Sequence, residues 1–230
     1  MNDLPWGPEE EAWLTREGLG LDDGRRRLLA RYRMLLEEAN TRLNLTRLEG
    51  PEEFLRKHAL DALAFWALVP DSWRQGPGTL LDVGTGGGLP GIPMLLVLEG
   101  WRGVLLDATR KKVEAVQGFL EPLGLSERAL AVWGRVEDDR CLEGETYRLV
   151  VARAVKDLSL LLRWCGPRVA PGGRLIVSKG PRGPEELERA KDTMREAGLV
   201  LASLKEIALP HESGNRILMA FERPTTRISG

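Results

Sequence analysis

Apolar residues in the first third of the chain recur every three to four positions, which is the spacing of one face of a helix. After Asp22 such positions are Leu28, Leu29, Tyr32, Leu35, Leu36 and Ala39. Another helix is predicted to begin at Pro51, since a proline followed by two glutamates is typical of a first helical turn. Because Gln75–Gly78 then interrupts the pattern, we predict an N-terminal helical extension over residues 1–75 and a second domain over residues 76–230.

Beyond residue 76 the pattern changes to short apolar runs that alternate with helical stretches. Strands are predicted at Thr79–Val83, Val104–Asp107, Ala129–Trp133, Arg148–Ala152 and Arg174–Ser178. Helices are predicted around Met94–Leu98, Arg110–Leu120, Asp157 to about Val169, and Pro184–Ala197. The alternation indicates an α/β fold with a mostly parallel sheet. A last strand pair, Val200–Leu209 and Arg216–Glu222, has no helix between its members and predicts an antiparallel edge.

The composition is that of a soluble globular protein, with 43% hydrophobic and 29% charged residues among 230. The longest wholly apolar run, Ala62–Val69, is far shorter than the roughly 20 residues of a membrane span. The acidic N-terminus does not resemble a signal peptide, so we expect a cytoplasmic protein. The two cysteines and two histidines do not have zinc-ligand spacing, and no metal is expected.

The net charge of −1 argues against a nucleic-acid partner only until its distribution is considered. Residues 1–24 contain seven acids and one base, so their net charge is −6 and that of the remainder is +5. Residues 131–182 contain ten bases and six acids, a local net charge of +4. A local basic patch of this kind attracts phosphate without a basic total.

The strongest local signal is the glycine-rich turn within Leu80–Gly91, which separates a strand from a helix. Gly86, Gly88 and Gly91 satisfy the Gly-x-Gly-x-x-Gly pattern of dinucleotide-binding proteins. Asp82, two residues before Gly84, instead gives Asp-x-Gly-x-Gly-x-Gly, which resembles the first motif of class I S-adenosylmethionine-dependent methyltransferases. An acid there favours a cationic cosubstrate, whereas anionic dinucleotide phosphates gain nothing from it. A tight turn without any ligand is the third interpretation.

Two further segments favour the methyltransferase and narrow its target. Val169–Leu175 resembles the turn that enters the fifth strand of methyltransferases. The end of the fourth strand, Val151–Val155, lacks the motif typical of amine methylation. Cys141 and Cys165 do not follow a proline, as a cysteine that attacks a pyrimidine carbon usually does. The remaining target is an atom with a free lone pair, such as a ring nitrogen or a hydroxyl.

The extended glycine motif, Asp82–Pro93, resembles that of the bacterial small-subunit ribosomal RNA methyltransferase G family, also called glucose-inhibited division protein B. Further segments follow in family order: Asn44–Thr46, Arg56–Asp61, Asp107–Val113, Arg135–Glu137, Ala152–Ala154 and Lys179–Gly180. The resemblance implies a class I, Rossmann-like domain with a seven-stranded, mostly parallel sheet. It also implies methylation of guanine N7 in the 530 loop of 16S ribosomal RNA, with S-adenosyl-L-methionine as cofactor and S-adenosyl-L-homocysteine as product.

The implied partner is 16S ribosomal RNA in the 30S subunit or its precursor, met by a monomeric enzyme. Guanine N7 carries an in-plane lone pair and no proton, so direct in-line transfer needs no general base. No catalytic residue is therefore assigned. N7 lies in the deep major groove of A-form RNA, which side chains cannot enter, so the target must be unpaired or extruded.

Site residues are inferred from the same motifs. The cofactor is expected to meet Asp82, Gly84, Gly86, Gly88, Leu89, Asp107, Ala108, Thr109, Val136, Glu137 and Arg153. RNA is expected to meet Asn44, His58, Arg135, Lys179 and Arg182.

Each assignment has a purely structural alternative: turn geometry for the glycines, helix capping for Thr109 and surface charge for Lys179. His58 lies on an apolar face, where a core histidine bonded to Asp61 is the alternative to a substrate-facing one. An NAD-linked oxidoreductase and a non-catalytic ribosome assembly factor are the alternative functions.

Overall fold

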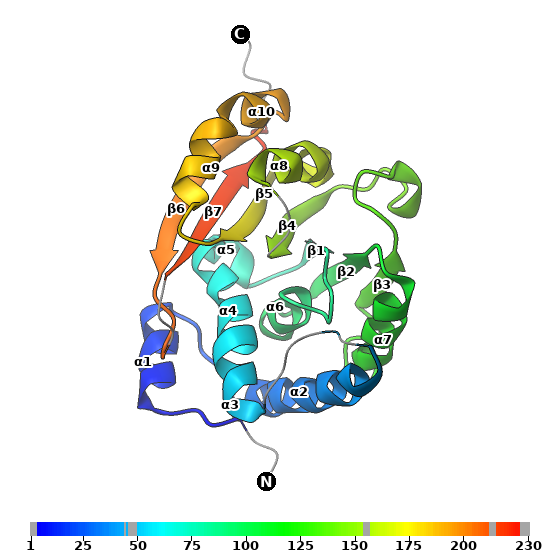
Figure 1. The fold of residues 1–230 in the computed structure, drawn as a ribbon, viewed down its shortest axis with the longest axis vertical. Helices are drawn as coiled ribbons and strands as arrows, with labels where there is room; N and C mark the ends of the chain where they lie inside the picture. Colours follow the sequence, from blue (N-terminus) through cyan, green and yellow to red (C-terminus); the bar gives the residue numbers. More distant parts are fainter. Residues whose placement is uncertain (1–3, 44, 46–49, 154–156, 212–214, 226–230) are drawn as a thin grey trace.

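A computed structural model describes residues 4–43, 45, 50–153, 157–211 and 215–225. Its centre is a seven-stranded sheet of order β3-β2-β1-β4-β5-β7-β6 (Figure 1). The strands are β1 (Gly78–Val83), β2 (Trp101–Asp107), β3 (Ala129–Trp133), β4 (Tyr147–Arg153), β5 (Val169–Lys179), β6 (Val200–Ile207) and β7 (Arg216–Glu222). β7 runs antiparallel to both neighbours. The antiparallel pair is confirmed, but β7 lies inside the sheet and the edge strand β6 runs parallel to β5.

The fifth strand starts earlier than the sequence pattern predicts. The expected turn at Pro171–Gly173 lies within β5, where the register with β4 shifts and Gly172 has φ +74°. Only glycine adopts that backbone conformation without strain, so the segment bends and still pairs at both ends. The helix expected over Pro184–Ala197 is divided into α9 (Gly183–Arg189) and α10 (Lys191–Glu196).

Helices cover both faces of the sheet, and each face has its own hydrophobic cluster. The first face carries α1 (Pro8–Arg16), α2 (Asp23–Leu43), α5 (Asp71–Arg74), α6 (Gly91–Val97) and α7 (Arg110–Leu120). It also carries one continuous helical segment of α3 (Pro51–Phe54), a π-helical turn (Leu55–Ala59), α4 (Leu60–Leu63) and a 3-10 turn (Ala64–Leu68). Leu80 of β1 belongs to this cluster and the next residue, Leu81, to the other, as the alternation along a strand requires. The N-terminal helices thus share a core with the sheet, and the boundary at residue 76 stays a prediction.

The second face is covered by α8 (Leu158–Cys165), α9 and α10. The connection from β3 to β4 contains only a short 3-10 turn, Asp139–Cys141, where the other crossovers carry a longer helix. β3 is an edge strand by its place in the strand order, and its Leu130 and Trp133 are more than half exposed. Among the described residues, no helix is long and apolar enough to cross a membrane.

The parallel strands all end at the same edge of the sheet. The loops that follow β1, β2, β3 and β5 gather there, and in open α/β sheets ligands bind in the crevice at this edge. The strand order reverses between β1 and β4, so the crevice is expected above that pair.

Candidate functional site

The glycine loop between β1 and α6 turns sharply over the end of the sheet. The backbone N–H groups of Gly84 and Thr85 both donate to the Leu106 carbonyl, at 2.9 Å each. Gly84, Gly86 and Gly88 have φ values of +73°, +59° and +104°, which L side chains rarely adopt. Among the described residues, a Cβ on Gly86 would meet only the Gly84 carbonyl oxygen, at 4.0 Å, so the described part of the chain leaves space for a ligand over the loop.

Asp82 fastens this loop from inside the sheet. Its fully buried carboxylate accepts from the Thr85 hydroxyl at 2.6 Å and from the Gly91 N–H at 2.8 Å, both at Oδ2. Gly91 has no room for a side chain, since a Cβ there would lie 2.3 Å from Leu105 and 2.7 Å from Asp82 Oδ2. Oδ1 of Asp82 is buried and finds no hydrogen-bond partner among the described residues. Burial raises the pKa of Asp82 to about 6, against the hydrogen bonds that lower it.

Asp107, at the end of β2, connects two loops through its carboxylate. Oδ2 accepts from the Gly86 N–H at 2.9 Å and Oδ1 from the Thr109 N–H at 2.8 Å. Each oxygen keeps acceptor capacity for a hydroxyl. Thr109 occupies the N-cap position of α7, but its hydroxyl makes no capping bond, so the capping alternative is not supported. Its neighbour Ala108 is exposed beside it.

The end of β3 borders a pocket of about 500 Å³, lined by Ala108, Trp133, Gly134, Arg135, Asp138, Arg140 and Cys141. Val136 is buried, and its carbonyl accepts hydrogen bonds from Nε and one terminal nitrogen of Arg168, each at 3.4 Å. Glu137 is exposed and lies 3.8 Å from the Arg135 guanidinium. Leu89 of the glycine loop is buried and belongs to the hydrophobic core.

Arg153, at the end of β4, is held by a residue of the N-terminal helices. Its guanidinium donates to Asp61 Oδ2 at 2.9 Å, while Arg216 Nε donates to Asp61 Oδ1 at 2.6 Å. The three side chains are only 18%, 7% and 28% exposed for Arg153, Asp61 and Arg216, respectively. Both carboxylate oxygens of Asp61 thus accept from arginines, and the three side chains form an Arg153–Asp61–Arg216 cluster.

His58 lies beside that cluster and packs near Phe54, with ring centroids 6.2 Å apart. Burial and the Arg153 charge lower the pKa of His58 to about 4, so the ring is neutral at physiological pH. Among the residues assigned to RNA, Arg135 and Arg182 are exposed. Lys179 is largely buried and forms a 3.0 Å ion pair with Glu186. Asn44 lies outside the described residues.

The sequence reasoning missed the contact that supports the glycine loop from behind. The hydroxyl of Tyr32 on α2 donates to the Gly87 carbonyl at 2.8 Å, and the ring is fully buried. Leu36 packs one helical turn further, 2.7 Å from the point where a Cβ on Gly87 would lie. The N-terminal helices therefore shape the loop as well as covering the sheet.

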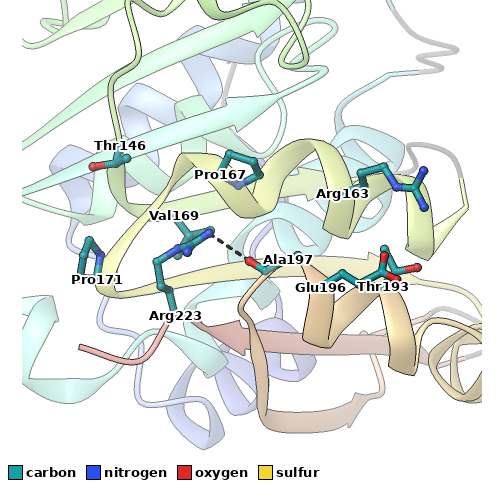
Figure 2. Close-up of a pocket in the computed structure, with 9 residues that line it drawn as sticks. All are labelled: Thr146, Arg163, Pro167, Val169, Pro171, Thr193, Glu196, Ala197 and Arg223. Carbon is teal, nitrogen blue, oxygen red and sulfur yellow. Dashed lines mark hydrogen bonds between the residues drawn. The ribbon is translucent and has the colours of Figure 1, made fainter. Parts of the chain in front are cut away.

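Figure 2 shows a second pocket, of about 580 Å³. It lies at the end of the sheet where β5 begins, opposite the ends of the parallel strands that form the crevice. Val169 at the start of β5 and Arg223 after the end of β7 line it. Arg223 donates to the carbonyls of Gly166 and Ala197, at 2.7 and 3.1 Å, where two helical segments end. This pocket is remote from the crevice and its arginine serves the packing of helix ends. No group of three potential metal ligands occurs in the described parts of the chain.

Comparison with known sequences identifies the family. The profile of the family described as rRNA small subunit methyltransferase G matches residues 25–213. The curated "Ribosomal RNA small subunit methyltransferase G" of Alkaliphilus metalliredigens is 35% identical over 90% of this chain and 85% of its own. The chain belongs to this family. Its counterpart from Symbiobacterium thermophilum is 36% identical over 84% of this chain and 80% of its own. The expected family is confirmed, and membership favours the methyltransferase over the dinucleotide interpretation of the glycine loop.

Solved structures confirm the expected fold. Cofactor-bound Rv0187 from MTB has a TM-score of 0.61 at 20% identity and covers 95% of this chain and 99% of its own. TrmN from Thermus thermophilus has a TM-score of 0.57 at 17% identity, over 82% of this chain and 52% of its own. Aeropyrum pernix fibrillarin with bound S-adenosyl-L-methionine has a TM-score of 0.54 at 13% identity, over 70% and 73%. The sheet is that of class I methyltransferases.

Proposed function

We propose that this protein transfers the methyl group of S-adenosylmethionine to N7 of a guanine in the 530 loop of 16S ribosomal RNA. The observation that carries the proposal is the buried carboxylate of Asp82, whose Oδ1 has no partner among the described residues. A negative charge held under the glycine loop favours a cationic ligand, which S-adenosylmethionine is and a dinucleotide is not. Family membership supplies the RNA substrate.

The residues around the loop fit the cofactor. The open space over Gly86 admits its methionine end, and Asp107 has acceptor capacity for the ribose hydroxyls. Ala108 and Thr109 are exposed next to Asp107, where the adenosine would extend toward β3 and Glu137. When bound, the cofactor supplies an electrophilic methyl group on a positively charged sulfur.

The chain's own contribution is then position and electrostatics. Asp82 and Asp107 hold the glycine loop rigid through backbone N–H groups, so the loop needs no reorganisation when it is filled. Arg153, fixed by Asp61, lies where the strand order reverses, between the β1–β3 loops and the β4–β7 side. We assign the first side to the cofactor and the second to the target guanine, with exposed Arg182 toward the phosphates. Neutral His58 adds no charge there.

Methyl transfer to isolated 30S subunits, naked 16S RNA and a duplex version of the 530 loop tests this proposal. With radioactive cofactor, we expect incorporation into the loop-containing substrates and little into the duplex, because N7 is unreachable in an A-form groove. Equal rates on duplex and loop RNA would contradict the extruded-guanine mechanism. Binding of 30S subunits without any methyl incorporation would indicate an assembly factor instead.

A further inference from the structure

Trp133 is unusual among the seven tryptophans of the chain. It is 59% exposed at the end of β3, whereas the other six are buried or partly buried. A large aromatic ring left in water forgoes the stabilisation that burial of about 150–250 Å² gives. Packing therefore does not explain its place at the sheet edge that carries the candidate site.

The ring is nevertheless fixed in position. Its indole N–H donates to the Ala108 carbonyl at 3.0 Å, which ties β3 to the loop after β2. A side chain whose edge is already bonded loses little conformational entropy when a flat group stacks on its face. Trp133 is thus a preorganised aromatic surface.

Arginines surround this surface. The Arg110 guanidinium lies 5.9 Å from the Trp133 ring centroid, and Arg135 and Arg140 line the adjoining 500 Å³ pocket. These three side chains are 72%, 65% and 90% exposed, respectively. Each has a nearby carboxylate, but exposed ion pairs of this kind contribute little and exchange readily with a phosphate. An aromatic face bordered by arginines is the combination that binds unpaired nucleotides.

We propose that Trp133, with Arg110, Arg135 and Arg140, forms a stacking platform for an unpaired RNA base next to the target guanine. The platform rests on the proposed function for the identity of the RNA. β3 lies two strands from β1, about 10 Å at the usual strand spacing, so the platform is within a short stretch of nucleotides of the glycine loop. Figure 1 shows β3 at the free edge of the sheet beside α7. Trp133 at the end of that strand is exposed.

The arginines favour RNA over the cofactor's adenine as the group that stacks. S-adenosylmethionine carries no phosphate, so three cations near its adenosine end would gain nothing from it. A nucleotide brings one phosphate for each base, and each neutralised phosphate contributes to affinity and to salt dependence.

Binding rather than catalysis tests the platform. Trp133→Ala, Trp133→Phe and Arg110→Gln are compared with Leu130→Ala, a matched control that removes another exposed apolar side chain from β3. Binding to an unpaired 530-loop oligonucleotide and to 30S subunits is titrated, and the cofactor Kd is measured by calorimetry. We expect Trp133→Ala to weaken oligonucleotide binding about 5- to 150-fold, with Trp133→Phe intermediate, Leu130→Ala close to wild type and the cofactor Kd unchanged. Arg110→Gln is expected to lower the slope of log K against log salt by about 0.7.

Two outcomes would overturn the platform. Unchanged RNA affinity in Trp133→Ala would show that no base stacks there, and a weakened cofactor Kd with unchanged RNA affinity would assign the ring to adenine. Quenching of indole fluorescence by the oligonucleotide, present in wild type and lost in Trp133→Phe, supplies a readout that needs no methyl transfer. Absence of methylation with intact, Trp133-dependent RNA binding would therefore refute the proposed function and leave the platform standing.

Discussion

Replacing Asp61 by asparagine removes the carboxylate that Arg153 and Arg216 both contact at the crevice. Asparagine has nearly the same shape, but its amide nitrogen would face a guanidinium instead of accepting from it. Arg153 and Arg216, which contact Asp61 at 2.9 and 2.6 Å, would then be partly buried cations with a weakened counterion. The change therefore isolates the charge of Asp61 from its packing.

The size of the effect follows from the exposure of the three side chains. Breaking a fully buried ion pair by removing one partner costs about 3–5 kcal/mol. Here Asp61 is 7% exposed but the guanidinium groups of Arg153 and Arg216 are 18% and 28% exposed, so water recovers part of the loss. We expect a loss of about 2–3 kcal/mol in the free energy of unfolding. For a chain of this length, that lowers the Tm by about 4–12 °C.

Thermal unfolding followed by circular dichroism at neutral pH measures the change, and urea unfolding gives the free energy. Asp192→Asn is the matched control, because its ion pair with Arg195 is 82% and 74% exposed for the two side chains. We expect that control to lie within about 0.5 kcal/mol of wild type. Equal losses in the two variants, or an unchanged Tm in Asp61→Asn, would refute the view that Asp61 neutralises a buried cluster.

Three other substitutions test the site. In wild type, cofactor affinity should fall as the pH drops through about 6, where Asp82 becomes neutral. Asp82→Asn should bind the cofactor weakly at every pH. Calorimetric pH profiles that run parallel for the two proteins would contradict this. The pKa of His58 is lowered from 6.5 to about 4 in the folded protein, so between these pH values the unfolded chain binds a proton at His58 that the folded protein does not. Protons therefore favour unfolding, and wild type loses stability as the pH falls from about 6.5 to 4. His58→Gln lacks this loss, so a stability difference between the two that stays constant with pH in urea titrations would be inconsistent with a buried neutral ring. Tyr32→Phe leaves the Gly87 carbonyl without its 2.8 Å donor, at a cost of about 1–3 kcal/mol in urea unfolding, and should weaken cofactor binding; wild-type values for both would count against the loop support.

The parts of the molecule that sequence analysis predicted are those in which neighbours along the chain cooperate. The limits of β3, α7 and β7 follow from local apolar periodicity and were predicted to the residue. The glycine loop with Asp82 and Asp107 forms its hydrogen bonds across strand ends that the motif itself defines. The place of β7 between β5 and β6 was not predicted, because strand order depends on which edges pair in space.

The missed contacts join residues that are distant in sequence. Arg153 and Asp61 are 92 positions apart, Arg216 and Asp61 are 155 apart, and Tyr32 and Gly87 are 55 apart. No periodicity encodes such pairs. One signal was present, since an acid at Asp61 within a mostly apolar helical face needs a charged or hydrogen-bonding partner. The exposure of Trp133 had no signal, because an aromatic at the end of a strand is usually buried.

The most direct test of the central claim is to map the nucleotide that becomes methylated. The full-length protein is incubated with 30S subunits and S-adenosylmethionine, the 16S RNA is recovered, and chain cleavage at 7-methylguanine is read by primer extension. The account predicts one enzyme-dependent cleavage, at a guanine of the 530 loop, which is absent when the cofactor is omitted. Methylation at another atom or outside that loop would contradict it.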